Sequence, residues 1–105
     1  MDDPTWETVR RLVEWLDAHS AGGPEARSLL RVLKLSEEVG EVSEALIGVL
    51  GQNPRKGVTH TWADVHDELC DVILSAMVAL ATLTPDAAAV FAARLAVVAG
   101  RSLGE

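Results

Sequence analysis

The segment 72–83, VILSAMVALATL, carries no charged side chain and constrains the fold more than any other part of the chain. Twelve helical residues at ~1.5 Å each span ~18 Å, well short of the ~30 Å hydrocarbon core of a membrane. A helix that is apolar on every face is instead buried on all sides. The rest of a 105-residue chain is too small to enclose it. We therefore expect a helix-bundle homo-oligomer, either a homodimer or a homotetramer, with this helix near the subunit contact.

Proline and glycine divide the chain into helical segments. Apolar residues recur at spacings of three and four over residues 4–19, 24–50 and 62–83. Thr61, with Asp64 three residues later, forms a capping-box-like start for the third segment. Thr84-Pro85-Asp86 begins a fourth helix that we expect to end at about Gly100. Since no stretch alternates long enough for a strand, these patterns predict one all-α domain of four helices, residues 1–105.

Charge and cysteine content narrow the class of partner and the compartment. The chain has 16 acidic and 9 basic residues, a net charge of -7, so its field repels polyanions and nucleic acid is not an expected partner. Cys70 is the only cysteine, which excludes an intramolecular disulfide and fits a reducing compartment. The opening MDDPTWETVRRL lacks the cationic start and apolar run of a secretory signal. We expect a cytoplasmic protein that binds no membrane.

Acidic residues gather in two short windows, one on the second expected helix and one on the third. Glu38 and Glu41 are three residues apart, as are Glu68 and Asp71, and such pairs project from one helix face. In an antiparallel hairpin, Glu41 and Glu68 lie ~13 and ~10 Å from the connecting loop, and Glu38 and Asp71 lie ~18 and ~15 Å from it. Four carboxylates then converge. Such crowding requires a cation, and oxygen ligands without histidine or cysteine favour Mg²⁺ or Mn²⁺.

A solvated face with salt bridges is the ordinary explanation of an acidic helix. However, no lysine or arginine occurs between Glu37 and Glu44 or between Asp64 and Asp71, and only Lys34 lies one turn before the first window. Cations therefore explain these carboxylates better than salt bridges do. A di-iron carboxylate bundle would need Glu-x-x-His pairs, which the sequence lacks.

Two short motifs give a family resemblance. The sequence EEVGE at 37–41, followed after 26 residues by ELCD at 68–71, resembles the EExxE and ExxD motifs of the MazG-like all-α nucleoside triphosphate pyrophosphohydrolases. This resemblance implies a Mg²⁺-dependent enzyme of nucleotide-pool housekeeping. Such an enzyme cleaves a nucleoside triphosphate between the α and β phosphates and releases the monophosphate and pyrophosphate.

The resemblance also implies a role for each motif residue. By motif position, Glu38, Glu41, Glu68 and Asp71 are the metal ligands. Glu37 and Glu38 are the catalytic carboxylates, and Glu37 would orient or deprotonate the attacking water or bind a further metal. A carboxylate of pKa ~4.3 is a poor base at neutral pH, so a metal-bound water of lowered pKa is the sensible nucleophile.

Few cations are available for a triphosphate. Lys34 lies one turn from Glu38 on the same face, where it can contact phosphate, pair with Glu37 or Glu38, or do both. Arg55 and Lys56 lie in the loop between the motif helices, where they either close over a triphosphate or are simply solvated.

A further pair of basic residues lies late in the chain. Arg94 and Arg101, seven apart on the fourth expected helix, resemble the late Lys-to-Arg pair common in the family and are candidates for phosphate binding. The sequence departs from the family pattern at Val98, where an asparagine is frequent.

The nucleobase needs a flat aromatic partner, and two tryptophans are candidates. Trp62 lies at the start of the third expected helix, beside the loop. Trp15 with His19 resembles the WxxxH spacing in helix 1 of the dCTP-hydrolysing branch. The helical spacing of Trp15 with its apolar neighbours also fits ordinary core packing.

Two other functions stay open. A phosphoribosyl-ATP pyrophosphohydrolase would use the same carboxylates, and a substrate panel separates it from the nucleotide enzyme. A non-catalytic interaction module would use the acidic cluster to bind a structural cation or a basic partner. In that case Glu38→Gln would change no activity, because there would be none.

Overall fold

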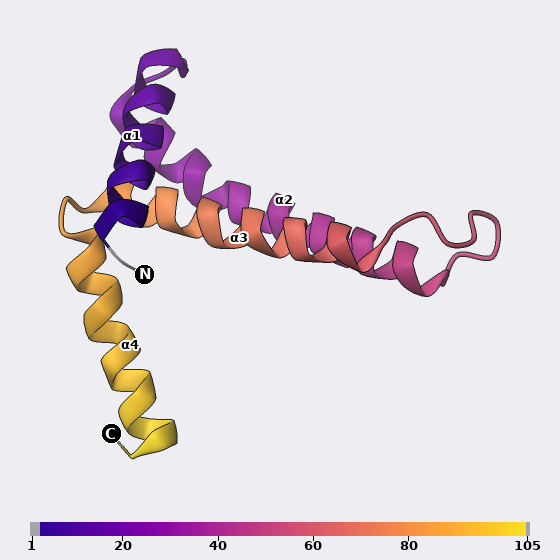
Figure 1. Cartoon of the computed structure of the whole chain (residues 1–105). Helices are drawn as coiled ribbons and strands as arrows, with labels where there is room; N and C mark the ends of the chain where they lie inside the picture. Colours follow the sequence, from indigo (N-terminus) through magenta and orange to yellow (C-terminus); the bar gives the residue numbers. More distant parts are fainter. Residues whose placement is uncertain (1–2, 105) are drawn as a thin grey trace. The chain divides into compact units, whose positions relative to one another are not determined.

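The computed structural model describes residues 3–104 and consists of helices joined by loops (Figure 1). No strand occurs within this range, so the all-α prediction is confirmed. The first three helices match their predicted bounds to within one residue. The helices are α1 (Asp3–His19), α2 (Pro24–Leu50), α3 (Trp62–Leu83) and α4 (Ala87–Leu103).

The ends of α4 differ from the prediction. The helix continues through Gly100 to Leu103, and its carboxyl cap is Gly104, which has φ +71° and donates its N–H to the Gly100 carbonyl oxygen. Glycine adopts this left-handed conformation without steric cost, so the helix ends at Gly104 rather than Gly100. At the other end, the Asp86 side chain makes no capping hydrogen bond. The Asp86 backbone N–H instead donates to Thr84 Oγ1 at 3.2 Å.

The predicted capping box at the start of α3 is confirmed. The Thr61 N–H donates to Asp64 Oδ2 at 2.8 Å, and the Asp64 N–H donates to Thr61 Oγ1 at 3.3 Å. The backbone hydrogen bond from Thr61 lowers the pKa of the Asp64 carboxyl below its ordinary value of 3.8. Asp64 therefore stabilises a helix end and needs no metal ion to account for its charge.

We expect Thr61→Ala to lower the free energy of unfolding by about 1 kcal/mol, because it removes this cap.

The contribution of Asp64 to stability depends on pH, since its pKa is lower in the folded chain than in the unfolded chain. That contribution is complete above pH 3.8 and is lost as the pH falls through the folded value. The stability gap between wild type and Asp64→Ala should therefore shrink below pH 3.8 in urea unfolding. A gap that is the same at pH 7 and pH 2 would contradict this role.

Packing divides the chain into two compact units, and the predicted single domain stays a prediction. The first unit joins the N-terminal segment up to Ser20 to the C-terminal segment from Met77. Its core brings α1, the end of α3 and α4 together, with the Trp6 and Phe91 rings 6.1 Å apart. Burying these large apolar side chains is the main source of stability for this unit. The core residues are Trp6, Val9, Met77 and Ala87, with Val78, Leu80, Ala81 and Phe91 packed against them.

The apolar segment 72–83 is only partly covered by the described chain, as expected for a helix that one short chain is too small to enclose, and its full burial in an oligomer stays a prediction. Met77 and Ala79 are buried, whereas Ile73, Leu74 and Leu83 stay exposed. The physical reason is that neighbouring helices of one short chain cover only part of the α3 surface. Among the described residues no single helix is long and apolar enough to cross a membrane, although α3 and α4 taken together as a bent pair reach the same length and apolarity.

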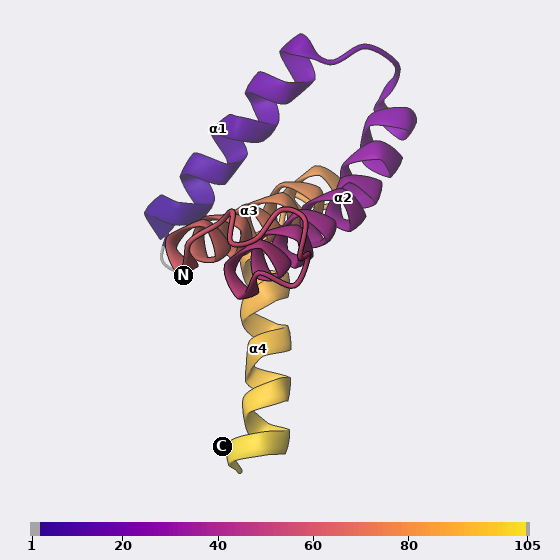
Figure 2. The same cartoon turned by 90° about the vertical axis from the view of Figure 1, so that its right-hand side faces the viewer.

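The second unit, Ala21–Ala76, is a helix hairpin. In it α2 and the first part of α3 run antiparallel and side by side (Figures 1 and 2). The loop closes tightly on the end of α2, where the Thr59 N–H donates to the Gly48 carbonyl oxygen at 3.0 Å. A Cβ added at Gly48 would lie 2.6 Å from Thr59 Oγ1 and would collide with the His60 ring. Only glycine fits here, and this contact fixes the heights of the two helices relative to each other.

We therefore expect Gly48→Ala to destabilise the chain by about 1–3 kcal/mol, because the added methyl overpacks a closed contact. The double variant with His60→Ala should recover much of this loss, since it removes the ring that the methyl meets. Urea unfolding of both variants measures the effect. A Gly48→Ala variant as stable as wild type would show that the loop does not close on α2 in this way.

Candidate metal centre

Carboxylates of α2 and α3 meet within the second unit. Glu38, Glu41 and Glu68 each offer one carboxylate oxygen, and these oxygens all lie within 4.8 Å of one another. This is the one such acidic, histidine or cysteine group found in residues 3–104. Two of the three residues are one turn apart on α2 and the third faces them from α3, as the antiparallel hairpin requires.

Asp71 lies outside this group, so the expected convergence of all four carboxylates is wrong for this residue. Its side chain is exposed, one turn beyond Glu68 on α3. An aspartate is one methylene shorter than a glutamate and reaches less far across the gap between helices. Its role as a metal ligand stays a prediction.

The group concentrates negative charge where water has little access. Only 9% of the Glu38 surface is exposed, and Glu38 Oε2 and Glu68 Oε2 are buried without a hydrogen-bond partner. The pKa of Glu41 is raised above its ordinary value, first by the negative charge of Glu38, then by partial burial and by Glu68. Buried carboxylate oxygens without a donor are costly, and a bound cation would remove that cost.

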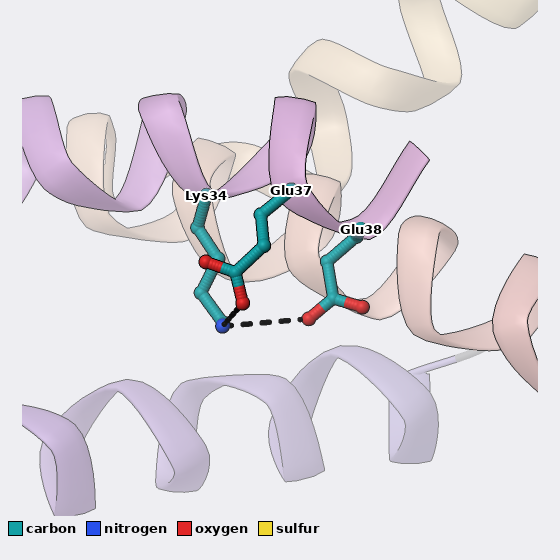
Figure 3. A network of polar contacts seen from close by, with 3 residues as sticks. All are labelled: Lys34, Glu37 and Glu38. Carbon is teal, nitrogen blue, oxygen red and sulfur yellow. Dashed lines mark hydrogen bonds and ion pairs between the residues drawn. The ribbon is translucent and has the colours of Figure 1, made fainter. Parts of the chain in front are cut away.

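One basic side chain lies at the edge of the group. Lys34 Nζ is 3.4 Å from Glu37 Oε1 and 3.5 Å from Glu38 Oε1 (Figure 3). These contacts raise the pKa of Lys34, mainly through Glu37. The salt bridge of Lys34 with Glu37 and Glu38, one of the alternatives from the sequence, is therefore present. A role of Lys34 in phosphate binding stays a prediction. The salt bridge leaves the second oxygen of Glu38 unpaired.

The donor set fits a small hard cation. Two ligands on opposite sides of Mg²⁺ at ~2.1 Å each are ~4.2 Å apart, which is compatible with oxygens that lie within 4.8 Å of one another. The three clustered residues are all glutamates, and both Cys70 and His66 are exposed on α3 outside the group. Oxygen donors alone favour Mg²⁺ or Mn²⁺ over Zn²⁺.

Glu37, the predicted catalytic carboxylate, is exposed and lies beside Lys34 rather than among the three clustered oxygens. Its side chain is exposed to solvent and points toward Lys34 (Figure 3). It is thus accessible to water, and its catalytic role stays a prediction.

The loop between α2 and α3 holds two more of the predicted phosphate contacts and a pocket that sequence reasoning missed. Arg55 and Lys56 are exposed, and the Arg55 N–H donates to Asn53 Oδ1 at 3.1 Å. Lys56 lines a pocket of about 230 Å³ at the tip of the hairpin. Gly48, a glycine near the end of α2, was the sequence signal that could have indicated this pocket. The pocket is lined by Glu44, Ile47, Gly48, Asn53, Lys56, Gly57, Thr59 and His60.

The remaining predicted residues are exposed. Trp62 belongs to the second unit, whereas Arg94, Arg101 and Trp15 belong to the first, and their functional roles stay predictions. Core packing is the wrong explanation for Trp15, because 59% of its surface is exposed. Its ring stacks on His19 with the centroids 4.3 Å apart.

Comparison with known proteins does not place the chain in a family. No protein family, curated protein or solved structure matches it.

Proposed function

We propose that the chain is a Mg²⁺-dependent nucleoside triphosphate pyrophosphohydrolase with a MazG-like fold. One observation carries the proposal. Glu38, Glu41 and Glu68, which the EExxE and ExxD motifs assign as metal ligands, bring carboxylate oxygens within 4.8 Å of one another, and Glu38 and Glu68 each have a buried oxygen without a hydrogen-bond partner. The acidic residues would then favour substrate binding, because a cation bound to them turns the local repulsion of phosphate into attraction.

The metal would be held by these three glutamates, with Asp71 one turn along α3 as a fourth ligand. Bound there, Mg²⁺ supplies charge neutralisation at the phosphoryl oxygens and lowers the pKa of water. Glu37 would accept a hydrogen bond from the attacking water and take up one of its protons, while the water oxygen bonds to a phosphorus of the α–β anhydride, the bridging P–O bond breaks, and monophosphate and pyrophosphate separate. The half-exposed Lys34 offers its ammonium group to a phosphate oxygen. Lys56 and Arg55 offer further positive charge from the loop.

The proposal includes a homo-oligomeric helix bundle and a cytoplasmic role in clearing nucleotides from the pool. The exposed apolar residues of α3 support the oligomer, because they leave surface for another subunit to cover.

A substrate panel tests the proposal. Pyrophosphate release with Mg²⁺ is measured for the common and several oxidised nucleoside triphosphates and for phosphoribosyl-ATP. Release from a nucleoside triphosphate supports the proposed enzyme, and release from phosphoribosyl-ATP alone supports the related alternative. If Glu38→Gln and Asp71→Asn both leave turnover of the best substrate unaltered, the proposed site is wrong.

A structural cation site is the second candidate. It is favoured by the position of Asp71 outside the group and by the engagement of Lys34 with Glu37 and Glu38. It predicts metal binding without turnover of any substrate in the panel.

A further inference from the structure

A pocket in the first unit differs in chemistry from the acidic group of the second. It has a volume of about 250 Å³ and lies where the start of α1 packs against the corner between α3 and α4 (Figure 1). Among the described residues that line it there is no carboxylate, and the charged side chain in its wall is Arg10 of α1. In a chain with 16 acidic and 9 basic residues, such a pocket is suited to an anionic ligand.

The buried indole of Trp6 gives this pocket a hydrogen-bond donor without a partner. Only 6% of the Trp6 surface is exposed, and the Phe91 ring packs beside it. No group within residues 3–104 accepts a hydrogen bond from the indole N–H, yet its nitrogen is not among the fully enclosed atoms that lack a partner. The N–H therefore keeps contact with open space, and Trp6 lines this pocket. A buried donor in that position favours a ligand that accepts a hydrogen bond.

Two further kinds of donor line the same pocket. Thr84 Oγ1 accepts the Asp86 N–H, so the Thr84 hydroxyl proton stays available to a ligand. Ala87 and Ala88 are the first residues of α4, and the Asp86 side chain does not cap the N–H groups of this helix end. The start of a helix carries a positive charge equivalent to about half an elementary charge. The hydroxyl and the helix end thus favour the same kind of ligand as the indole N–H does.

Arg10 adds a full positive charge. Its side chain is exposed and forms no ion pair with a residue of the described chain, although Glu7 and Glu14 lie one turn away on either side. A guanidinium group offers two parallel N–H groups to a carboxylate, and such charge-assisted hydrogen bonds are about twice as strong as neutral ones. One guanidinium and one helix end match a single negative charge better than the nearly double charge of a phosphate ester.

The remaining wall of the pocket is apolar and fits a small ligand. A cavity of about 150 Å³ already holds benzene. This pocket, at about 250 Å³, therefore has room for one ring or a short chain in addition to a charged group. It is smaller than the ~300–1,000 Å³ that is usual for larger ligands. The apolar wall consists of the Trp6 ring and the side chains of Ala81, Pro85, Ala87 and Ala88.

We propose that this pocket binds a small organic carboxylate whose apolar body is about the size of one ring. The carboxylate accepts hydrogen bonds from the Arg10 guanidinium, the Trp6 indole N–H and the first turn of α4. The apolar body packs on Ala81 and Pro85. Because the ligand contacts α1 and both sides of the α3–α4 corner, its binding stabilises the first unit. This inference does not depend on the proposed catalytic function.

The NMR signal of the Trp6 indole N–H tests the inference. Benzoate is titrated into the isotope-labelled full chain at constant ionic strength, and the signal is assigned among the three tryptophans by its loss in Trp6→Phe. The signal should shift and saturate with a dissociation constant of about 1 mM. Benzamide should bind at least about tenfold more weakly because it lacks the charge. Acetate should also bind more weakly than benzoate because it lacks the apolar ring.

Two neighbouring arginines provide the variant and its matched control. Arg10→Gln should weaken benzoate binding at least about tenfold, because it removes the charged donor. Arg11→Gln should bind benzoate as the wild type does, since Arg11 is the next residue of α1 and does not line the pocket. Both side chains are exposed, so neither variant removes core packing.

Three results would overturn the inference. The first is a Trp6 signal that benzoate does not shift, and the second is equal benzoate binding by Arg10→Gln and Arg11→Gln. The third is saturable binding of inorganic phosphate that Arg10→Gln abolishes, without binding of benzoate. That last result would replace the carboxylate site with a phosphate site.

Discussion

Glu38→Gln is expected to slow Mg²⁺-dependent pyrophosphate release by about 10²- to 10³-fold. The substitution keeps the size and shape of the side chain but removes the charge from the most buried carboxylate of the group, of which 9% is exposed. A metal that stabilises transition-state charge contributes several kcal/mol, and each 1.36 kcal/mol lost costs a factor of ten. The measurement is kcat for the best nucleotide at saturating Mg²⁺.

Glu44→Gln is the matched control for this prediction. Glu44 is a glutamate of the same helix, one turn beyond Glu41, and it is exposed and outside the three-carboxylate group. Its loss should change kcat less than about threefold, as expected for a solvated surface charge. Equal effects of Glu38→Gln and Glu44→Gln would show that general acidity, and not the group, supports turnover.

Divalent metal is expected to stabilise the wild type strongly and Glu38→Gln weakly. At 100 times the dissociation constant, a ligand specific for the folded chain adds about 2.7 kcal/mol. In a domain of this size that raises the thermal midpoint by about 10 °C or more. Thermal unfolding with Mg²⁺ or Mn²⁺, compared with EDTA, measures the shift for both proteins.

The order of stability should reverse when the metal is removed. In EDTA, Glu38→Gln should be at least as stable as the wild type, because it relieves repulsion among three carboxylates within 4.8 Å. The Lys34 contact that it loses is half-exposed, and such pairs contribute about 0–1 kcal/mol. Equal metal shifts in the two proteins, or a wild type that stays the more stable in EDTA, would contradict a cation site at Glu38.

Local signals made most of the helix bounds predictable. Thr61 and Asp64 fix the start of α3 through neighbouring hydrogen bonds, which depend on sequence spacing alone. The end of α4 was missed because two glycines compete there, and only the conformation of Gly104 shows which one stops the helix. The partial cover of 72–83 was predictable from the small size of the chain, whereas what covers the rest of this helix was not, because apolar side chains do not specify their partner.

Helix geometry made the heights of the candidate site residues along α2 and α3 predictable. The rise per residue placed Glu41 and Glu68 at similar heights, and the structure brings them together with Glu38. Asp71 lies outside the group, and helix geometry alone does not account for the length of a side chain, which is one methylene shorter in aspartate than in glutamate. The stacking of Trp15 on His19 depends on side-chain conformation and exposure, which the spacing of apolar neighbours did not show.

The identity of the products tests the central claim most directly. The best nucleoside triphosphate is incubated with the protein and Mg²⁺, and all phosphate-containing products are resolved by phosphorus NMR. The account predicts nucleoside monophosphate and pyrophosphate in equal amounts, formed with Mg²⁺ and absent with EDTA. Nucleoside diphosphate with inorganic phosphate, or the same products at the same rate in EDTA, would contradict it.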